Sequence, residues 1–101
     1  MNMYYIVRSY VAAADKTDQF EAVYSPNGEW FHFFEKCEDF LGLELIKNAG
    51  DGSYLRIDKW ISKASYNDFL QEQQSLYEQL NAQYSELYTE ETLLGEYDTI
   101  S

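Results

Sequence analysis

The chain has 101 residues, a formal net charge of −11 at pH 7 and an aromatic content of 18%. This length fits one domain over residues 1–101. The seven basic residues are scattered, and phosphate binding needs clustered Lys and Arg, so we expect neither nucleic acid nor an anionic membrane as a partner. The single Cys37 excludes an internal disulfide. With no signal peptide and no apolar run near ~20 residues, a cytoplasmic protein is expected.

The first third of the chain predicts one strand and two helical segments. Residues 4–13 carry β-forming side chains in alternation, which indicates a strand. A helix should begin near Lys16, and its cap should be one of Asp15, Thr17 and Asp18. The Pro-Asn-Gly turn at 26–28 interrupts this helix. A second helix over 29–37 is so aromatic that we expect protein to surround it almost completely.

The rest of the chain predicts a hairpin, a long helix and a last strand. Residues 40–47 and 54–60 form two strands joined by a glycine-rich turn. Ser62 is a good N-cap for a helix over 63–88, whose apolar residues recur at three- and four-residue spacing. Residues 92–100 predict the fourth strand.

The order β-α-β-β-α-β predicts an α+β, ferredoxin-like fold, with an antiparallel four-stranded sheet and helices on one face. The uncovered face carries Leu, Ile, Val and Tyr side chains, which are costly to leave in water. We therefore expect a homodimer through the open sheet face, in which two sheets close into a dimeric α/β barrel.

The third strand separates two kinds of side chain by alternation. Leu55, Ile57 and Lys59 lie on one face, and the opposite face carries Tyr54, Arg56, Asp58 and Trp60. A large aromatic at the strand exit and a tyrosine one turn into the helix should converge where strand and helix meet. Trp60 and Tyr66 are thus expected to line a pocket there.

The segments 40–42 (Phe-Leu-Gly), 54–60 and 62–69 resemble the antibiotic biosynthesis monooxygenase family of dimeric α/β-barrel proteins. The resemblance implies a monooxygenase that acts on a small aromatic or quinone-type compound and needs no cofactor or metal. In such enzymes the ionised substrate passes an electron to dioxygen, inside a dry apolar pocket with hydrogen-bond donors. The residues that match Trp60 and Tyr66 line that pocket, so Trp60 and Tyr66, together with His32, are the candidate catalytic residues.

Two positions depart from the family pattern. Arg56 stands where those oxygenases carry an asparagine, and Leu80 stands in the region of their helix arginine. The haem-degrading branch is disfavoured, because it needs a late helix histidine and residues 71–88 contain none. Trp30 and Phe69 complete the candidate substrate-binding residues, together with Arg56 and Asp58.

The charged candidates each have a structural and a functional interpretation. His32, the only histidine, either lies on a helix surface or acts as a base or donor beside Trp60, and it predicts no metal site. Arg8 and Arg56 either pair with Asp58, Glu44 or Glu96 across the dimer barrel or bind a carboxylate or enolate ligand. Asp58 is either the partner of an arginine or, with a pKa raised by burial, a general base.

Two other function classes fit the same barrel, because one fold hosts many functions. The first is a non-catalytic, small-ligand-binding or stress-response protein that uses the same pocket. The second is an isomerase or cyclase that uses His32 or Asp58 for acid–base chemistry.

Overall fold

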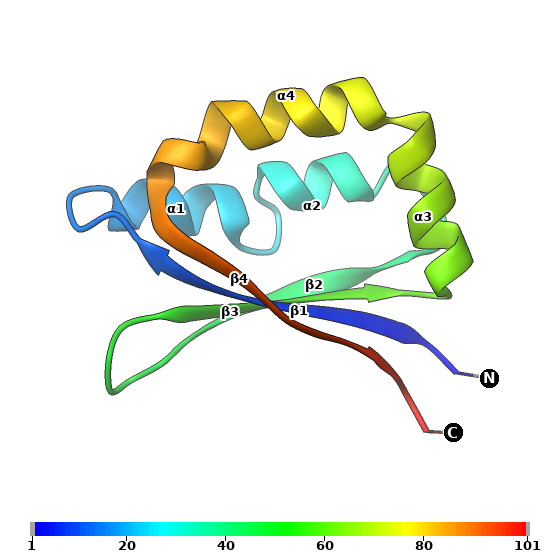
Figure 1. Cartoon of the computed structure of the whole chain (residues 1–101), viewed down its shortest axis with the longest axis horizontal. Coiled ribbons are helices and arrows are strands. Elements are labelled where there is room, and N and C mark those ends of the chain that lie inside the picture. Colours follow the sequence, from blue (N-terminus) through cyan, green and yellow to red (C-terminus); the bar gives the residue numbers. More distant parts are fainter. Residues whose placement is uncertain (1, 101) are drawn as a thin grey trace.

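The computed structural model describes residues 2–100. Its elements, in chain order, are β1 (Tyr4–Ala12), α1 (Thr17–Tyr24), α2 (Glu29–Phe34), β2 (Phe40–Lys47), β3 (Tyr54–Trp60), α3 (Lys63–Glu72), α4 (Gln74–Tyr84), the 3-10 turn Ser85–Leu87 and β4 (Tyr88–Asp98). The sheet order is β2-β3-β1-β4, and every pairing is antiparallel. All helices lie on one face of the sheet (Figure 1), so the ferredoxin-like α+β prediction is confirmed.

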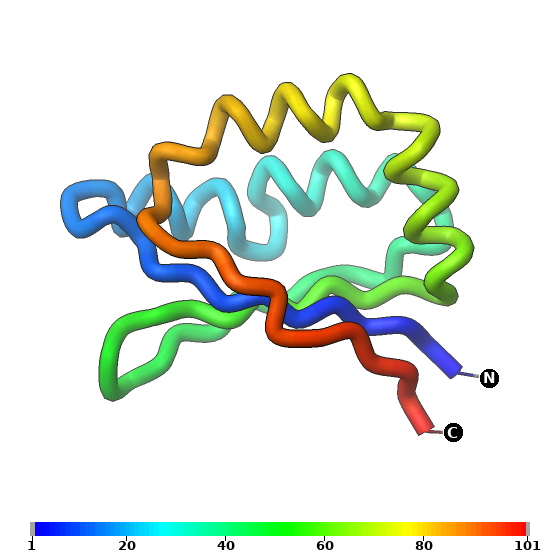
Figure 2. Tube along the Cα trace, viewed as in Figure 1, coloured from blue at the N-terminus to red at the C-terminus, as the bar shows by residue number. Residues whose placement is uncertain are grey.

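The central strands β1 and β3 place the candidate residues on the covered face. Tyr4 pairs with Trp60 in β3 and with Asp98 in β4, which brings the two chain ends side by side (Figure 2). The alternation predicted for β3 is confirmed, because its even-numbered residues are buried and its odd-numbered residues are half-buried. Arg56 and Asp58 therefore point between the sheet and the helices.

The first two helices differ in detail from the prediction. Lys16 occupies the N-cap of α1 and makes no side-chain capping bond, so the expected cap by a neighbouring carboxylate or threonine is wrong. α2 ends at Phe34 rather than at residue 37. The chain turns there, because Cys37 N donates to Phe34 O at 3.0 Å and Phe40 N donates to Cys37 O at 3.2 Å. These two turns connect the end of α2 to the beginning of β2 at Phe40.

The predicted helix over 63–88 is instead two helices and a 3-10 turn. Ser62 caps α3 as predicted, since its Oγ accepts from Ser65 N at 3.1 Å. The break falls at Gln73 (φ −109°, ψ 24°), the polar residue that interrupts the apolar stripe. A straight helix would aim Gln73 at the core, whereas the break directs α4 over α2. β4 then starts at Tyr88, four residues earlier than predicted.

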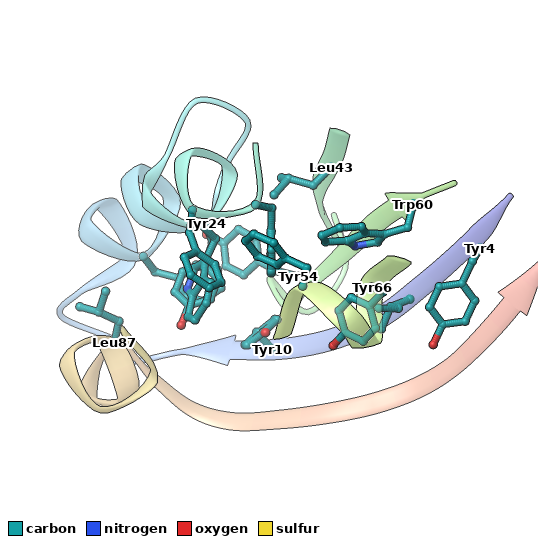
Figure 3. Packing of buried hydrophobic residues seen from close by; sticks show 14 residues of the cluster. Tyr4, Tyr10, Tyr24, Leu43, Tyr54, Trp60, Tyr66 and Leu87 are labelled. Carbon is teal, nitrogen blue, oxygen red and sulfur yellow. The ribbon is translucent and has the colours of Figure 1, made fainter. Parts of the chain in front are cut away.

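The core between sheet and helices is built mainly of aromatic rings. Figure 3 shows Trp60, Tyr66 and Tyr4 at one end of this core and Tyr24 and Leu87 at the other. The buried hydrophobic residues are Tyr4, Ile6, Tyr10, Phe20, Tyr24, Trp30, Phe33, Phe34, Leu43, Tyr54, Trp60, Tyr66, Phe69 and Leu87. None of the described helices is long and apolar enough to cross a membrane.

The opposite sheet face has no helix over it and carries many apolar side chains beside the Glu44–Lys59 ion pair. Val11, Ile46 and Tyr97 are 40%, 50% and 53% exposed there, and Val7 and Ile57 are half-buried. These are the side chains from which the sequence predicts a dimer interface.

Candidate functional site

A buried ion cluster lies on the covered face of the two central strands. Arg56 Nε lies 3.1 Å from Asp58 Oδ1, and Arg8 Nη1 lies 3.6 Å from Asp58 Oδ2. Asp58 is 0% exposed and Arg56 is 4% exposed. The arginines thus pair with Asp58 inside one subunit, which corrects the expectation of pairing across the dimer barrel. Glu44 and Glu96 pair with Lys59 and Lys63 instead.

Four aromatic rings surround the guanidinium of Arg56. Its Cζ lies 5.7 Å from the ring centroid of Tyr10, 5.6 Å from Tyr24, 5.5 Å from Trp30 and 5.9 Å from Phe34. At these distances the electron-rich ring faces attract a cation, most strongly when water is excluded. We call these four rings the aromatic cage; it explains how the interior holds a charged group without solvent.

Burial and charge act against each other within the cluster. Complete burial raises the pKa of the Asp58 carboxyl, while the Arg56 and Arg8 guanidiniums counteract that rise. Burial alone would lower the pKa of Arg56, but the Asp58 carboxylate and the nearby tyrosines raise it overall. Arg56 therefore stays a cation, and its charge favours the carboxylate form of Asp58.

Trp60 and Tyr66 meet at the end of β3, as the sequence predicts. Their ring centroids are 5.4 Å apart, and the ring of Phe69 lies 5.7 Å from that of Trp60. Arg8 Nη2 donates a long hydrogen bond of 3.5 Å to Tyr66 Oη, which joins this aromatic group to the ion cluster. Burial raises the pKa of Tyr66, although Arg8 works against that rise. The Tyr66 hydroxyl thus keeps its proton at neutral pH.

Several buried polar atoms of this region have no hydrogen-bond partner within residues 2–100. They are the indole Nε1 atoms of Trp30 and Trp60, the Nε and Nη1 of Arg56 and both carboxylate oxygens of Asp58. Arg56 and Asp58 are in ion contact, but their donor and acceptor are not aligned for a hydrogen bond. Buried polar groups in native proteins are nearly always satisfied, so this concentration marks a candidate functional site.

The interior beside Trp60 is filled by side chains. Phe40 and Phe34 place their ring centroids 5.2 Å and 5.6 Å from that of Trp60, on the sides not taken by Tyr66 and Phe69. Three hollows found on the described surface are open to solvent, and neither Trp60 nor Tyr66 lines any of them. The predicted pocket position is therefore closed in this conformation.

His32 lies away from Trp60, on the outer side of α2. Its Nδ1 is 3.4 Å from Glu35 Oε1, and its side chain is 56% exposed. It lines a hollow of about 220 Å³ between α2 and α4, whose lining residues are Glu29, His32, Phe33, Lys36, Leu76 and Leu80. We call this hollow the α2–α4 hollow. Leu80, at the place of the expected helix arginine, faces it as well.

The structure brings together most of the residues that the sequence singles out. The covered face of β3 carries Arg56, Asp58 and Trp60. Tyr66 and Phe69 pack against it from α3, and Trp30 reaches the same region from α2. Sequence reasoning missed the remaining members of the aromatic cage, Tyr10, Tyr24 and Phe34. Only Tyr10 could have been found from the sequence, because it is two residues after Arg8 in β1 and alternate residues of a strand point to the same face.

Ionisation of Tyr24 should make stability fall at alkaline pH. Burial raises the pKa of Tyr24 from 10.0 to about 12, although Trp30 and Arg56 favour its phenolate. Because the folded state holds this proton more tightly, its stabilising contribution is complete below pH 10 and lost as pH rises through 12. The loss from this one group is about 3 kcal/mol. Urea unfolding of wild type and Tyr24→Phe across this range measures it; parallel curves for both proteins would refute it.

Comparisons with known proteins agree on the fold. No protein-family model matches the sequence, and no curated protein matches it significantly. Among solved structures, a Chloroflexus aurantiacus J-10-fl protein assigned to the antibiotic biosynthesis monooxygenases has a TM-score of 0.65 and 17% identity, over 98% of this chain and 92% of that one. A Nitrosomonas europaea protein assigned to the same group has a TM-score of 0.62 and 11% identity, over 98% and 88%.

A third similar structure is a variant of SnoaB, a cofactor-independent oxygenase from Streptomyces nogalater. It has a TM-score of 0.63 and 19% identity, over 99% of this chain and 94% of that one. The chain therefore has the fold of the antibiotic biosynthesis monooxygenases. At these identities the likeness establishes the fold, and the reaction has to be argued from the site.

Proposed function

We propose that this protein is a cofactor-independent monooxygenase that acts on a small aromatic or quinone-type compound. It works as a homodimer joined through its open sheet faces, with one ligand site per subunit between sheet and helices. The fold shared with SnoaB supports the reaction class. The apolar outer face of the sheet supports the dimer.

The observation that carries this proposal is the unpartnered indole N–H of Trp60. It is fully buried beside Tyr66 and close to the ion cluster. A fixed donor in a dry site stabilises negative charge on oxygen far better than water does, because it needs no reorganisation. Charge of that kind develops when an ionised phenol passes an electron to dioxygen. Trp60 is thus the donor to substrate or peroxide oxygen.

The neighbouring groups suit the proton steps of the same reaction. Asp58, whose pKa burial raises, accepts the proton of the substrate hydroxyl and leaves a phenolate. The phenolate gives one electron to dioxygen, and the resulting radical pair combines to form a carbon–oxygen bond. Asp58 returns its proton to the resulting peroxide anion, and the hydroperoxide loses water as its O–O bond breaks and the same carbon loses its hydrogen, which leaves the quinone-type product. The Tyr66 hydroxyl supplies a second polar contact to the substrate.

One observation favours a second candidate, a non-catalytic binding protein. The ring of Trp60 is packed against four other aromatic rings, those of Phe34, Phe40, Tyr66 and Phe69. A ligand must move them apart, and a protein that opens to hold a hydrophobic metabolite needs no turnover. Oxygen consumption distinguishes this candidate from the first.

Oxygen uptake by purified, metal-free protein with a panel of dihydroxyarenes tests the proposal. We expect at least one compound to consume oxygen, and Trp60→Phe to lower the rate about 100-fold, the usual effect of removing one oxyanion donor. Tyr84→Phe, a change of similar kind on α4, is the matched control and should keep the rate. Binding without oxygen uptake would favour the second candidate, and neither binding nor uptake would exclude both.

A further inference from the structure

The ion cluster contains more guanidinium groups than directly paired carboxylates. Arg8 and Arg56 are the only two arginines of the sequence, and both contact the same carboxylate, Asp58. The two guanidiniums and one carboxylate have a formal charge of +1 in a protein whose net charge is −11, and Arg8, 17% exposed, is also drawn towards solvent and Glu96. Burying a charged group without a partner of opposite charge destabilises the folded protein by several kcal/mol.

The guanidinium of Arg56 also has unused hydrogen-bond donors. Its Nε and Nη1 have no hydrogen-bond partner among the described residues, and its side chain is 5% exposed. A guanidinium presents a planar fork that matches the two oxygens of a carboxylate. The rings of the aromatic cage adjoin this fork and offer flat apolar surfaces to a ligand ring.

We propose that the ligand of this site is an aromatic carboxylate, whose permanent negative charge is bound by Arg56. The ligand carboxylate displaces Asp58 from the fork, and Asp58 remains paired with Arg8. In this arrangement Asp58 is an internal counter-ion that competes with the ligand. The inference rests on the proposed function for the location of the site and adds the charge class of its ligand.

The α2–α4 hollow is connected to Arg56 through packed aromatic rings. Phe33 lines the hollow and packs against Trp30 with a centroid distance of 5.9 Å, and Trp30 belongs to the aromatic cage. Two successive rings, Phe33 and then Trp30, therefore separate the hollow from the guanidinium. α4 covers these rings and has no fully buried residue, and it begins at the break at Gln73. Outward movement of α4 would open a path for the ligand past these rings.

Calorimetric binding of 2-naphthoate and 2-naphthamide to the wild-type protein tests the charge class. The two probes have the same ring system and nearly the same shape, and only the first is an anion. We expect 2-naphthoate to bind about 10- to 100-fold more tightly, the value of a charge-assisted hydrogen bond. Equal affinities, or no binding of either probe, would overturn the inference without any variant.

Two variants separate a ligand contact from a merely structural role. Arg56→Gln should abolish the preference for the anion. Asp58→Asn removes the competing charge and should tighten 2-naphthoate binding about 10-fold, with 2-naphthamide unchanged. A structural role predicts that Asp58→Asn weakens both probes, and that result would contradict the inference. If either variant fails to fold, the double variant Arg56→Met with Asp58→Leu keeps the core apolar and should show no preference.

The outcomes for reaction and ligand are distinguishable. Preference for 2-naphthoate without oxygen uptake from any arene would exclude the monooxygenase and support the anion site. Oxygen uptake with equal affinity for both naphthalene probes would support the monooxygenase and exclude the anion site.

Discussion

Replacing Asp58 by alanine should lower the free energy of unfolding by about 3–5 kcal/mol. The substitution leaves Arg56 inside the aromatic cage with no counter-charge, and Arg8 loses the same partner. The cost arises chiefly from the stranded cation and less from the lost attraction. Since small domains are stable by only about 5–15 kcal/mol, this is among the largest effects expected for one substitution.

Urea unfolding followed by circular dichroism measures this loss. Asp68→Ala, on an exposed position of α3, is the matched control and should change stability little. The double variant Arg56→Met with Asp58→Leu should recover most of the stability, because an apolar pair of similar size replaces the buried ion pair and Arg8, 17% exposed, can turn to solvent. A double variant no more stable than Asp58→Ala would show that the cost lies in packing instead of charge.

Ile57→Lys should convert the homodimer into a monomer. Ile57 lies in β3 on the open face, between Val7 of β1 and Glu44 of β2. A lysine there must bury an ammonium group in the proposed interface, and its neighbour Glu44 is already paired with Lys59, so we expect the dissociation constant to rise by more than about 100-fold. Sedimentation equilibrium of the variant and the wild type measures this constant.

The matched control is Gln79→Lys, the same new side chain on the exposed surface of α4. It should remain dimeric, and both variants should keep the wild-type circular dichroism spectrum. A wild-type protein that sediments as a monomer would contradict the proposed dimer. An Ile57→Lys protein that stays dimeric would move the interface to another surface.

The four strands, and the side chains that β3 directs towards the candidate site, could be predicted from the local sequence pattern. Period-two alternation in residues 54–60 correctly placed Arg56, Asp58 and Trp60 on one face, and the hydroxyl of Ser62 correctly located the start of α3. Both signals lie within a few residues of each other along the chain. Such features depend on backbone geometry, which the sequence reports directly.

The cage around Arg56 and the break at Gln73 could not be predicted in the same way. The cage joins rings from β1, α1 and α2, and only tertiary packing determines which of many aromatic residues meet. At Gln73 helical periodicity continues on both sides, so a straight helix satisfies the pattern equally well. The break lets α4 pack over α2, where the ring centroids of Tyr77 and Trp30 are 5.7 Å apart.

The most direct test of a ligand site beside Trp60 uses the indole N–H signals of the two tryptophans in a ¹⁵N-labelled protein. Trp60→Phe assigns them, and 1,5-dihydroxynaphthalene is titrated without oxygen. If the ligand binds between sheet and helices, the Trp60 signal shifts in a saturable manner, because its unpartnered N–H gains an acceptor. If it stays fixed while only amides around the α2–α4 hollow shift, the ligand binds on the surface and the proposed site is wrong.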